Sequence, residues 1–130
     1  MFKVIALLAR KPGMSREAFI RHYETTHAPL GRKLFPQMVG YRRNYVDLTG
    51  AIIAAGAGAP DFDVVTEIWF SDRASYEAML ASHASDPAVG SLIDQDEENF
   101  LDRSKTRFFI VEEHGEETLG AETLERESAQ

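Results

Sequence analysis

Three strand-like segments of this sequence carry large apolar residues at both alternating positions. They are 2–9, 62–70 and 107–113, which read FKVIALLA, FDVVTEIWF and RFFIVEE. Successive side chains of a strand point to opposite faces of its sheet, so both faces of the predicted sheet are apolar. Helices of the same chain can cover one face, but the other would leave a large apolar patch in water. We therefore expect a homodimer that pairs two sheets face to face, encloses a core or a ligand-sized cavity and buries about 1,000 Å² or more.

The order of the predicted elements defines the fold class. A further strand is expected over 39–47 and the last strand over 106–113. A first helix is predicted from Arg16, with Ser15 as its N-cap, and a second helix begins after Ser71 or Asp72. The resulting order, β-α-β-β-α-β, is the split βαβ or ferredoxin-like arrangement, with the first and third strands central. The prediction is an α+β sandwich with a four-stranded antiparallel sheet.

Proline is expected to interrupt both helical regions. Ala28-Pro29 should kink or break the first helix after His27, because proline lacks an amide N–H and disfavours helical backbone in the preceding residue. A second short segment would then run over 29–35. Asp86 and Pro87 resemble an N-cap and a first helical residue, which predicts a short extra helix that ends near Ile93, before the last strand.

Length and composition indicate a single ordinary globular domain. The chain has 130 residues, 44% of them hydrophobic and 27% charged, and no cysteine. Residues 1–115 form the predicted domain, 48–61 are expected to be a Gly- and Ala-rich loop, and 116–130 are expected to be a flexible acidic tail. The absence of cysteine excludes disulfides, a thiolate nucleophile and cysteine-based metal sites.

The charge pattern and the hydropathy of the sequence indicate which classes of partner the protein is expected to lack. No basic run interleaved with aromatic residues is present, so we expect no nucleic-acid partner. The apolar run 4–9 is too short to span a membrane and no signal-peptide cleavage site follows it, so we expect no membrane partner and a cytoplasmic protein.

Residues 1–43 hold nine Lys and Arg against two Glu. This asymmetry could steer an anionic ligand, pair the basic half of one chain with the acidic half of another, or simply keep the protein soluble.

Tyr23 and His27 form an ionisable pair on the apolar face of the first helix. They lie four residues apart, on the same stripe as Phe19 and Leu30. The imidazole of His27, with an ordinary pKa near ~6.5, can take and give a proton around neutral pH. Alternatively, His27 is structural and bonds a backbone carbonyl freed at Pro29. Tyr23 is a candidate to hydrogen-bond a developing oxyanion, or it is an ordinary core residue.

Glu67 is a carboxylate between apolar neighbours on a predicted central strand. It alternates with Val65 and Trp69, so the three side chains share one face of the sheet. A carboxylate there is costly unless it is paired, and partial desolvation would raise its pKa. Glu67 is therefore a candidate to bind substrate, or it forms an ion pair with an arginine of another strand, for which the candidates are Arg42, Arg43 and Arg107.

The second strand supplies further candidates. Arg42 and Arg43 are consecutive, so one of them faces the core or cavity; a guanidinium there suits a carboxylate or enolate substrate. The alternation does not decide which of the two faces the cavity, and Arg43 is taken as the candidate for substrate binding. Tyr41 and Trp69 are candidate pocket residues that could equally be packing residues.

No cofactor or metal is expected. The four histidines show no H-x-x-x-H or similar spacing, so a metal site is not predicted and no haem ligand can be assigned. The loop 48–61 contains no G-x-G-x-x-G that leads from a strand into a helix. His22 projects about 100° from the stripe of His27 and is expected to be exposed, as are His83 and His114.

Five motifs resemble a known family. They are Arg10 to Ser15 followed by Phe19, Tyr23 to Leu30, Glu67 to Phe70, Asp96 to Asp102, and Phe109 to Glu113. In this order they are similar to the EthD-like proteins of the dimeric α/β-barrel superfamily, over residues 1–115. The resemblance implies a ferredoxin-like domain that dimerises as an α/β barrel, and it favours His27, because the family's histidine falls at this position. Its wider relatives include lactone isomerases, polyketide cyclases and decarboxylases, monooxygenases and haem-binding peroxidases.

Three functions follow as hypotheses. The first is a cofactor-independent isomerase, cyclase or decarboxylase that acts on a small hydrophobic carbonyl compound or lactone, in which His27 moves the proton while an arginine and Tyr23 stabilise enolate charge. The second is an oxidoreductase or monooxygenase component of ether or aromatic degradation. The third is a non-catalytic barrel that binds a hydrophobic metabolite. The lack of cofactor motifs counts against cofactor-dependent redox chemistry, and His27 counts against a passive barrel.

Overall fold

The structure of the chain is a computed structural model, and it describes residues 1–116. The tail predicted over 116–130 lies almost entirely outside the described residues. The elements in chain order are β1 (Phe2–Leu8), α1 (Arg16–His22), the π-helical turn η1 (Tyr23–His27), α2 (Ala28–Leu34), β2 (Met38–Tyr45), β3 (Val64–Phe70), α3 (Arg73–Ser85), α4 (Pro87–Phe100), the 3₁₀ turn η2 (Arg103–Lys105) and β4 (Arg107–Val111). No helix of the described part is long and apolar enough to cross a membrane.

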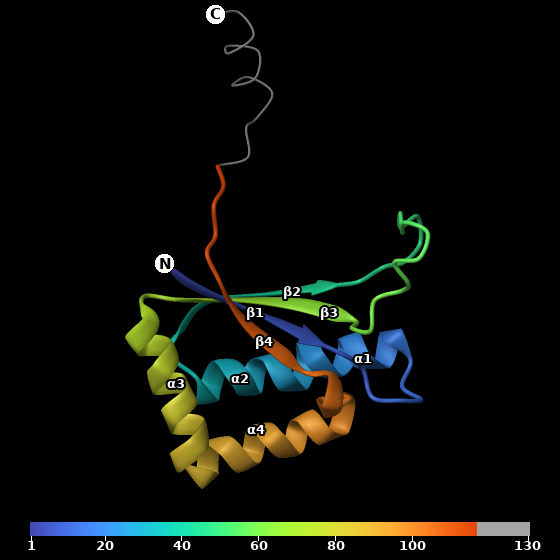
Figure 1. Cartoon of the computed structure of the whole chain (residues 1–130). Coiled ribbons are helices and arrows are strands. Elements are labelled where there is room, and N and C mark those ends of the chain that lie inside the picture. The colour runs from blue at the N-terminus through green and yellow to red at the C-terminus, as the bar shows by residue number, and fades with distance from the viewer. Residues whose placement is uncertain (117–130) are drawn as a thin grey trace, which may run out of the picture.

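The sheet has the predicted topology. Its strand order is β2-β3-β1-β4, all neighbours are antiparallel, and β1 and β3 are central. All the helices lie on one side of the sheet (Figure 1). The α+β, ferredoxin-like prediction is confirmed. The long connection between β2 and β3 extends away from the helices, and residues 47–59 in it are exposed.

The first helical region begins as predicted but does not break where predicted. Ser15 caps α1, because its hydroxyl accepts from the amide of Ala18 at 3.1 Å. No break follows His27, because the helical backbone continues through η1, where the amide of Ala28 donates to the carbonyl of Tyr23, five residues earlier. The second segment predicted over 29–35 is present as α2, which begins directly after His27. A π turn is wider than an α turn, which gives the ring of Pro29 room beside the preceding turn.

The prediction that the helix after Pro87 ends near Ile93 is also wrong. Asp86 caps α4 as expected, since its carboxylate accepts from the amide of Ala88 at 3.0 Å, but the helix runs on to Phe100. Ile93, Asp96 and Phe100 are all buried. Their spacing of three and four places them on one helix face, so the acidic segment is the outer side of an amphipathic helix.

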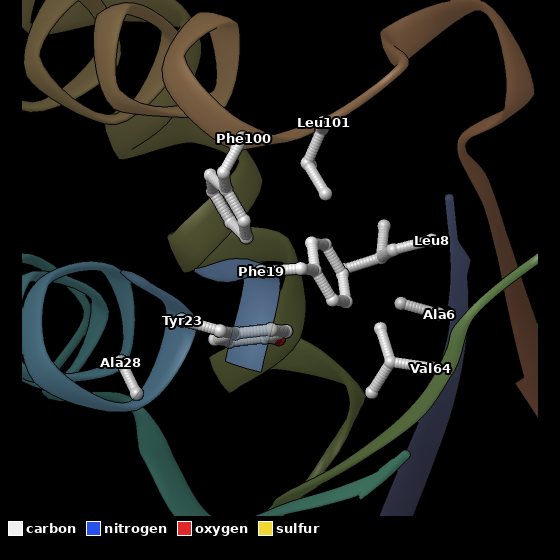
Figure 2. Packing of buried hydrophobic residues seen from close by; sticks show 8 residues of the cluster. All are labelled: Ala6, Leu8, Phe19, Tyr23, Ala28, Val64, Phe100 and Leu101. Carbon is white, nitrogen blue, oxygen red and sulfur yellow. The ribbon is translucent and has the colours of Figure 1, made fainter. Parts of the chain in front are cut away.

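Aromatic rings fill the space between the helices and one end of the sheet. Figure 2 shows one cluster of buried residues, in which Phe19, Tyr23 and Phe100 face side chains of β1 and β3. The ring centroids of Phe19 and Phe100 are 5.6 Å apart, and those of Tyr23 and Phe100 are 5.4 Å apart. A second cluster, around Val4, continues this core under α3.

The other side of the sheet, which no helix covers, is here called the open face. It carries Lys3, Ile5, Leu7, Val65, Glu67, Trp69, Phe109 and Val111, which lie opposite one another in the strand register. Most of these residues are half-buried by their neighbours, and Phe109 is exposed. The apolar second face that the strand pattern predicts is therefore present.

Phe19→Ala should destabilise the protein by about 3–5 kcal/mol, because the ring is 1% exposed and its removal leaves a cavity in the core. Urea unfolding followed by circular dichroism measures the change in the free energy of unfolding. Leu92→Ala, at a position on α4 that is 47% exposed, is the control and should cost less than about 1 kcal/mol. Equal losses in the two variants would contradict the assignment of the core.

Candidate active site between the helices and the sheet

A small cavity, here called the inner chamber, lies between the helices and the sheet. Its volume is about 80 Å³, and most of its lining is apolar. Its polar lining side chains are Tyr23, His27, Tyr41, Thr66 and Glu97. The sequence predicted that any ligand cavity would lie between two sheets, whereas the cavity that holds His27 lies within one chain, on the helix side.

His27 is held by a carboxylate of α4. Its Nδ1 lies 2.8 Å from Oδ2 of Asp96, and both side chains are buried. A carboxylate only accepts, so Nδ1 carries the hydrogen and Nε2 keeps its lone pair. Within residues 1–116, Nε2 has no hydrogen-bond partner. His27 therefore lines the inner chamber with one nitrogen fixed and the other available as a base.

Burial sets the protonation of this pair. Burial lowers the pKa of His27 below its ordinary value of 6.5, and the hydrogen bond to Asp96 raises it only in part. Burial acts to raise the pKa of Asp96, but hydrogen bonds from His27 and then His22 outweigh it, so the pKa of that carboxyl lies below its ordinary value. At neutral pH the pair is a neutral imidazole beside a carboxylate.

His22 is the second partner of Asp96. Its Nε2 lies 2.9 Å from Oδ1 of Asp96, and its ring stacks on Phe100 with centroids 4.8 Å apart. The prediction that His22 is exposed is wrong, since the side chain is only 22% exposed. The helical periodicity correctly placed His22 away from the face that carries His27. The side of the helix that carries His22 is nevertheless covered, because α4 packs against it.

Three hydroxyl groups form a short chain at the chamber wall. The hydroxyl of Tyr41 donates to that of Tyr23 at 3.1 Å, and Tyr23 lies 2.8 Å from Oγ1 of Thr66. Burial raises the pKa of Tyr23 well above its ordinary value, so its hydroxyl stays protonated. Three hydroxyl hydrogens serve two hydrogen bonds in this chain, which leaves one hydrogen for the oxygen of a ligand.

Arg43 lies on the helix side, but its charge already has a partner. Its Nε and Nη2 donate to Glu24 at 2.9 and 2.8 Å, and the guanidinium lies 4.7 Å from the ring centroid of Tyr41. Arg43 is absent from the lining of the inner chamber. It supports Tyr41 from outside, and its role in substrate binding stays a prediction.

Glu67 and Trp69 lie on the open face, on the opposite side of the sheet from His27. The carboxylate of Glu67 accepts from Lys3 at 2.6 Å and from Asn44 at 2.9 Å. Trp69 donates to Glu113 at 3.0 Å, and Lys3 lies 4.5 Å from its ring centroid. Glu67 is thus in an ion pair, but with a lysine rather than an arginine. Neither residue can share a ligand with His27 in the inner chamber.

Sequence reasoning missed Asp96, Thr66 and Glu97. Asp96 had a usable signal, because it occupies the same face of α4 as Ile93 and Phe100, where an isolated carboxylate needs a partner. Thr66 had a weaker signal: it is adjacent to Val65 in the predicted strand, so its side chain points to the opposite face of the sheet. No group of three or more His, Asp or Glu side chains that could hold a metal ion is present in residues 1–116.

A second cavity, here called the outer chamber, adjoins the first. It has a volume of about 300 Å³ and lies between α3, α4 and β4. Five residues line both chambers: Phe35, Met79, Ile93, Glu97 and Phe108. Together the chambers reach the roughly 300–1,000 Å³ that is typical of small-molecule sites.

Comparisons with known proteins agree with this fold. The family model described as the EthD domain matches residues 11–104. An EthD family protein from Bacillus halodurans is similar in structure, with 24% identity, a TM-score of 0.58, and coverage of 88% of this chain and 100% of that chain. HapK from Hahella chejuensis has 16% identity, a TM-score of 0.61, and coverage of 93% and 100%.

An EthD-like protein from Ralstonia eutropha has 18% identity, a TM-score of 0.55, and coverage of 85% and 86%. At such identities the structural likeness shows the fold alone. No curated protein matches the sequence.

NMR titration of the imidazole signals should place the pKa of His27 below 6.5, and Asp96→Asn should lower it further, because the carboxylate favours the imidazolium. Asp94→Asn is the matched control: Asp94 is also on α4 and contacts His83 at the same distance of 2.8 Å, so this variant should leave the His27 signal unchanged. A His27 pKa above 6.5, or one that Asp96→Asn does not change, would contradict the assigned pairing of His27 with Asp96.

Proposed function

This chain belongs to the EthD domain family, and we propose that it is a small-molecule enzyme that moves a proton on a small hydrophobic carbonyl compound or lactone without a cofactor. One observation carries the proposal: His27 is a buried, neutral imidazole with Nδ1 bound to Asp96 and Nε2 free at the wall of a cavity. That arrangement is typical of a general base. Isomerisation, cyclisation and decarboxylation share the enolate chemistry that it supports.

The proposed first step is removal of a proton next to the carbonyl group. The C–H bond breaks, Nε2 of His27 takes the proton, and the electron pair moves onto the carbonyl oxygen. Asp96 stabilises the imidazolium that forms, through the hydrogen bond at Nδ1. The protein then stabilises the enolate oxygen with a hydroxyl hydrogen.

The hydroxyl chain supplies that hydrogen bond. Tyr41, Tyr23 and Thr66 are linked in series at the chamber wall, and the remaining hydroxyl hydrogen is held in a site of low polarity. A preoriented donor in such surroundings stabilises developing negative charge more than water does. In this proposal Tyr23 is the central member of the chain, and Tyr41 orients it.

The apolar lining suits a hydrophobic substrate. The inner chamber is smaller than the roughly 150 Å³ cavity that holds benzene in an engineered protein core. It can therefore take the reacting carbonyl end of a ligand while the rest extends into the outer chamber. Apolar walls also exclude water from the enolate.

The open face supports a homodimer. Ile5, Leu7, Val65 and Val111 lie on this face around Phe109, which is 48% exposed, and no helix of the chain covers them. Association of two open faces removes this apolar surface from water. The chambers lie on the opposite side of the sheet, so each chain keeps its own chamber in such a dimer.

His27→Gln should lower proton transfer by about 10²-fold or more, because it removes the base. The assay follows deuterium incorporation next to the carbonyl of cyclohexanone, γ-butyrolactone and ethyl acetoacetate in D₂O by NMR. His114→Gln is the control, since the exposed His114 contacts a carboxylate outside both chambers and should leave the rate unchanged. Exchange by the wild type at the buffer rate would overturn the proposal and favour a binding protein.

Phe109→Glu should convert the dimer to a monomer, because it places a charge on the apolar surface of the proposed interface. Light scattering after size exclusion measures the mass at micromolar concentrations. Leu92→Glu, at a position 47% exposed on α4, adds the same charge on the other side of the molecule and should remain dimeric. A monomeric wild type would refute the homodimer without touching the proposed chemistry.

A further inference from the structure

Glu97 occupies a distinctive position between the two chambers. Of the residues in the described part that line both cavities, it alone has an ionisable side chain. Its neighbour Asp96 points to the histidines, whereas Glu97, one residue further along α4, faces the cavities. The proposed mechanism gives Glu97 no task.

The size of the inner chamber brings Glu97 and His27 to the same ligand. The chamber has about 80 Å³, so a carbonyl group with its neighbouring carbons fills it. A substrate that offers a proton to Nε2 of His27 therefore lies in the same small cavity whose lining includes Glu97. Apart from the two tyrosines, which keep their protons, these are the ionisable side chains that line this chamber in residues 1–116.

The charges around Glu97 leave its carboxylate only partly compensated. Nε of Arg103 lies 3.4 Å from it, but the same guanidinium also contacts Glu98 at 3.0 Å and Asp94 at 3.6 Å. Asp94 in turn contacts His83. Burial raises the pKa of Glu97 above its ordinary value, and Arg103 offsets this only in part. The protonated form is accordingly easier to reach than in an exposed glutamate.

We propose that Glu97 is a second catalytic residue, which donates a proton to the substrate carbon that His27 does not deprotonate. The inference rests on the proposed function. On a β,γ-unsaturated carbonyl compound, His27 takes a proton from the carbon between the carbonyl group and the double bond, and the electron pair of the broken C–H bond spreads over a dienolate. The O–H bond of Glu97 then breaks, and its proton forms a new C–H bond at the far carbon of the former double bond. The product is an isomer of the substrate, and no oxidant or reductant is needed.

The location of Glu97 also explains how the site resets. After one turnover His27 is protonated and Glu97 is a carboxylate. The Glu97 side chain is 22% exposed and borders the outer chamber, while His27 is 9% exposed. Glu97 can regain a proton from water in the outer chamber, and His27 returns its proton to water after the product has left.

The test separates the two proton-transfer steps with one probe for each. Isomerisation of cyclohex-3-enone to cyclohex-2-enone, followed by ultraviolet absorbance, requires a proton at a carbon other than the one deprotonated. Deuterium exchange next to the carbonyl of cyclohexanone requires only the base. Glu97→Gln should lower isomerisation by about 10²-fold and change the exchange rate by less than about threefold.

Two variants are matched controls. Glu98→Gln also loses a carboxylate partner of Arg103, but at a side chain that is 68% exposed, so both rates should persist. Glu77→Gln removes another carboxylate that pairs with an arginine, Arg73 at 3.1 Å, and it lies outside both chambers, so isomerisation should persist there too. Circular dichroism and thermal unfolding confirm that each variant is folded.

The outcomes distinguish the two proposals. A wild type that catalyses neither reaction overturns the proposed function and this inference together. Normal isomerisation in Glu97→Gln overturns only the inference. Equal losses of both rates in Glu97→Gln, or the same loss of isomerisation in Glu98→Gln, would show that Glu97 is structural and would also overturn it.

Discussion

The shared carboxylate of Asp96 is the interaction on which the helical layer and the site both depend. It joins α4 to the α1–η1–α2 helix through His22 and His27, at 2.9 and 2.8 Å. A buried carboxylate is costly unless its oxygens are satisfied, so both histidines must keep their positions. Phe100, one turn further along α4, packs on both imidazole rings. The contact that fixes the spacing of the helices therefore also fixes the tautomer of His27.

The sheet separates two kinds of surface. Its helix side holds the chambers, the dyad and the hydroxyl chain, while its open face holds apolar residues around the Lys3–Glu67 ion pair. Thr66 and Glu67 are adjacent in β3 and yet serve opposite sides. The surface of the proposed dimer and the chambers therefore lie on opposite faces, and a change on one face can alter one without altering the other.

Much of the fold could be predicted from the sequence, but less of the site. Ser15 and Asp86 are N-cap residues, so each predicts the start of a helix from the local sequence. The spacing of four residues between Tyr23 and His27 likewise predicts that they share a helix face. Alternation placed Glu67 and Trp69 on one face of the sheet. It could not say which face the helices cover, because both faces are apolar. The role of Asp96 could not be predicted, because its acidic neighbours make the segment resemble an exposed one. Its partners His27 and His22 also lie 69 and 74 residues away in the sequence.

Because of the π-helical turn, the geometry of the site depends on the number of residues between Phe19 and Pro29. An α turn would close with one residue fewer than the turn from Tyr23 to Ala28. Loss of one residue there would restore regular helix and leave the orientation of α2 nearly unchanged, because five residues of a π turn cover about the same rotation as four residues of an α-helix. The inner face would then hold one residue where His27 and Ala28 are now both buried. Among sequences that share this site, the number of residues from Phe19 to Pro29 should be as invariant as the histidine itself, and insertions should accumulate in the exposed connection between β2 and β3.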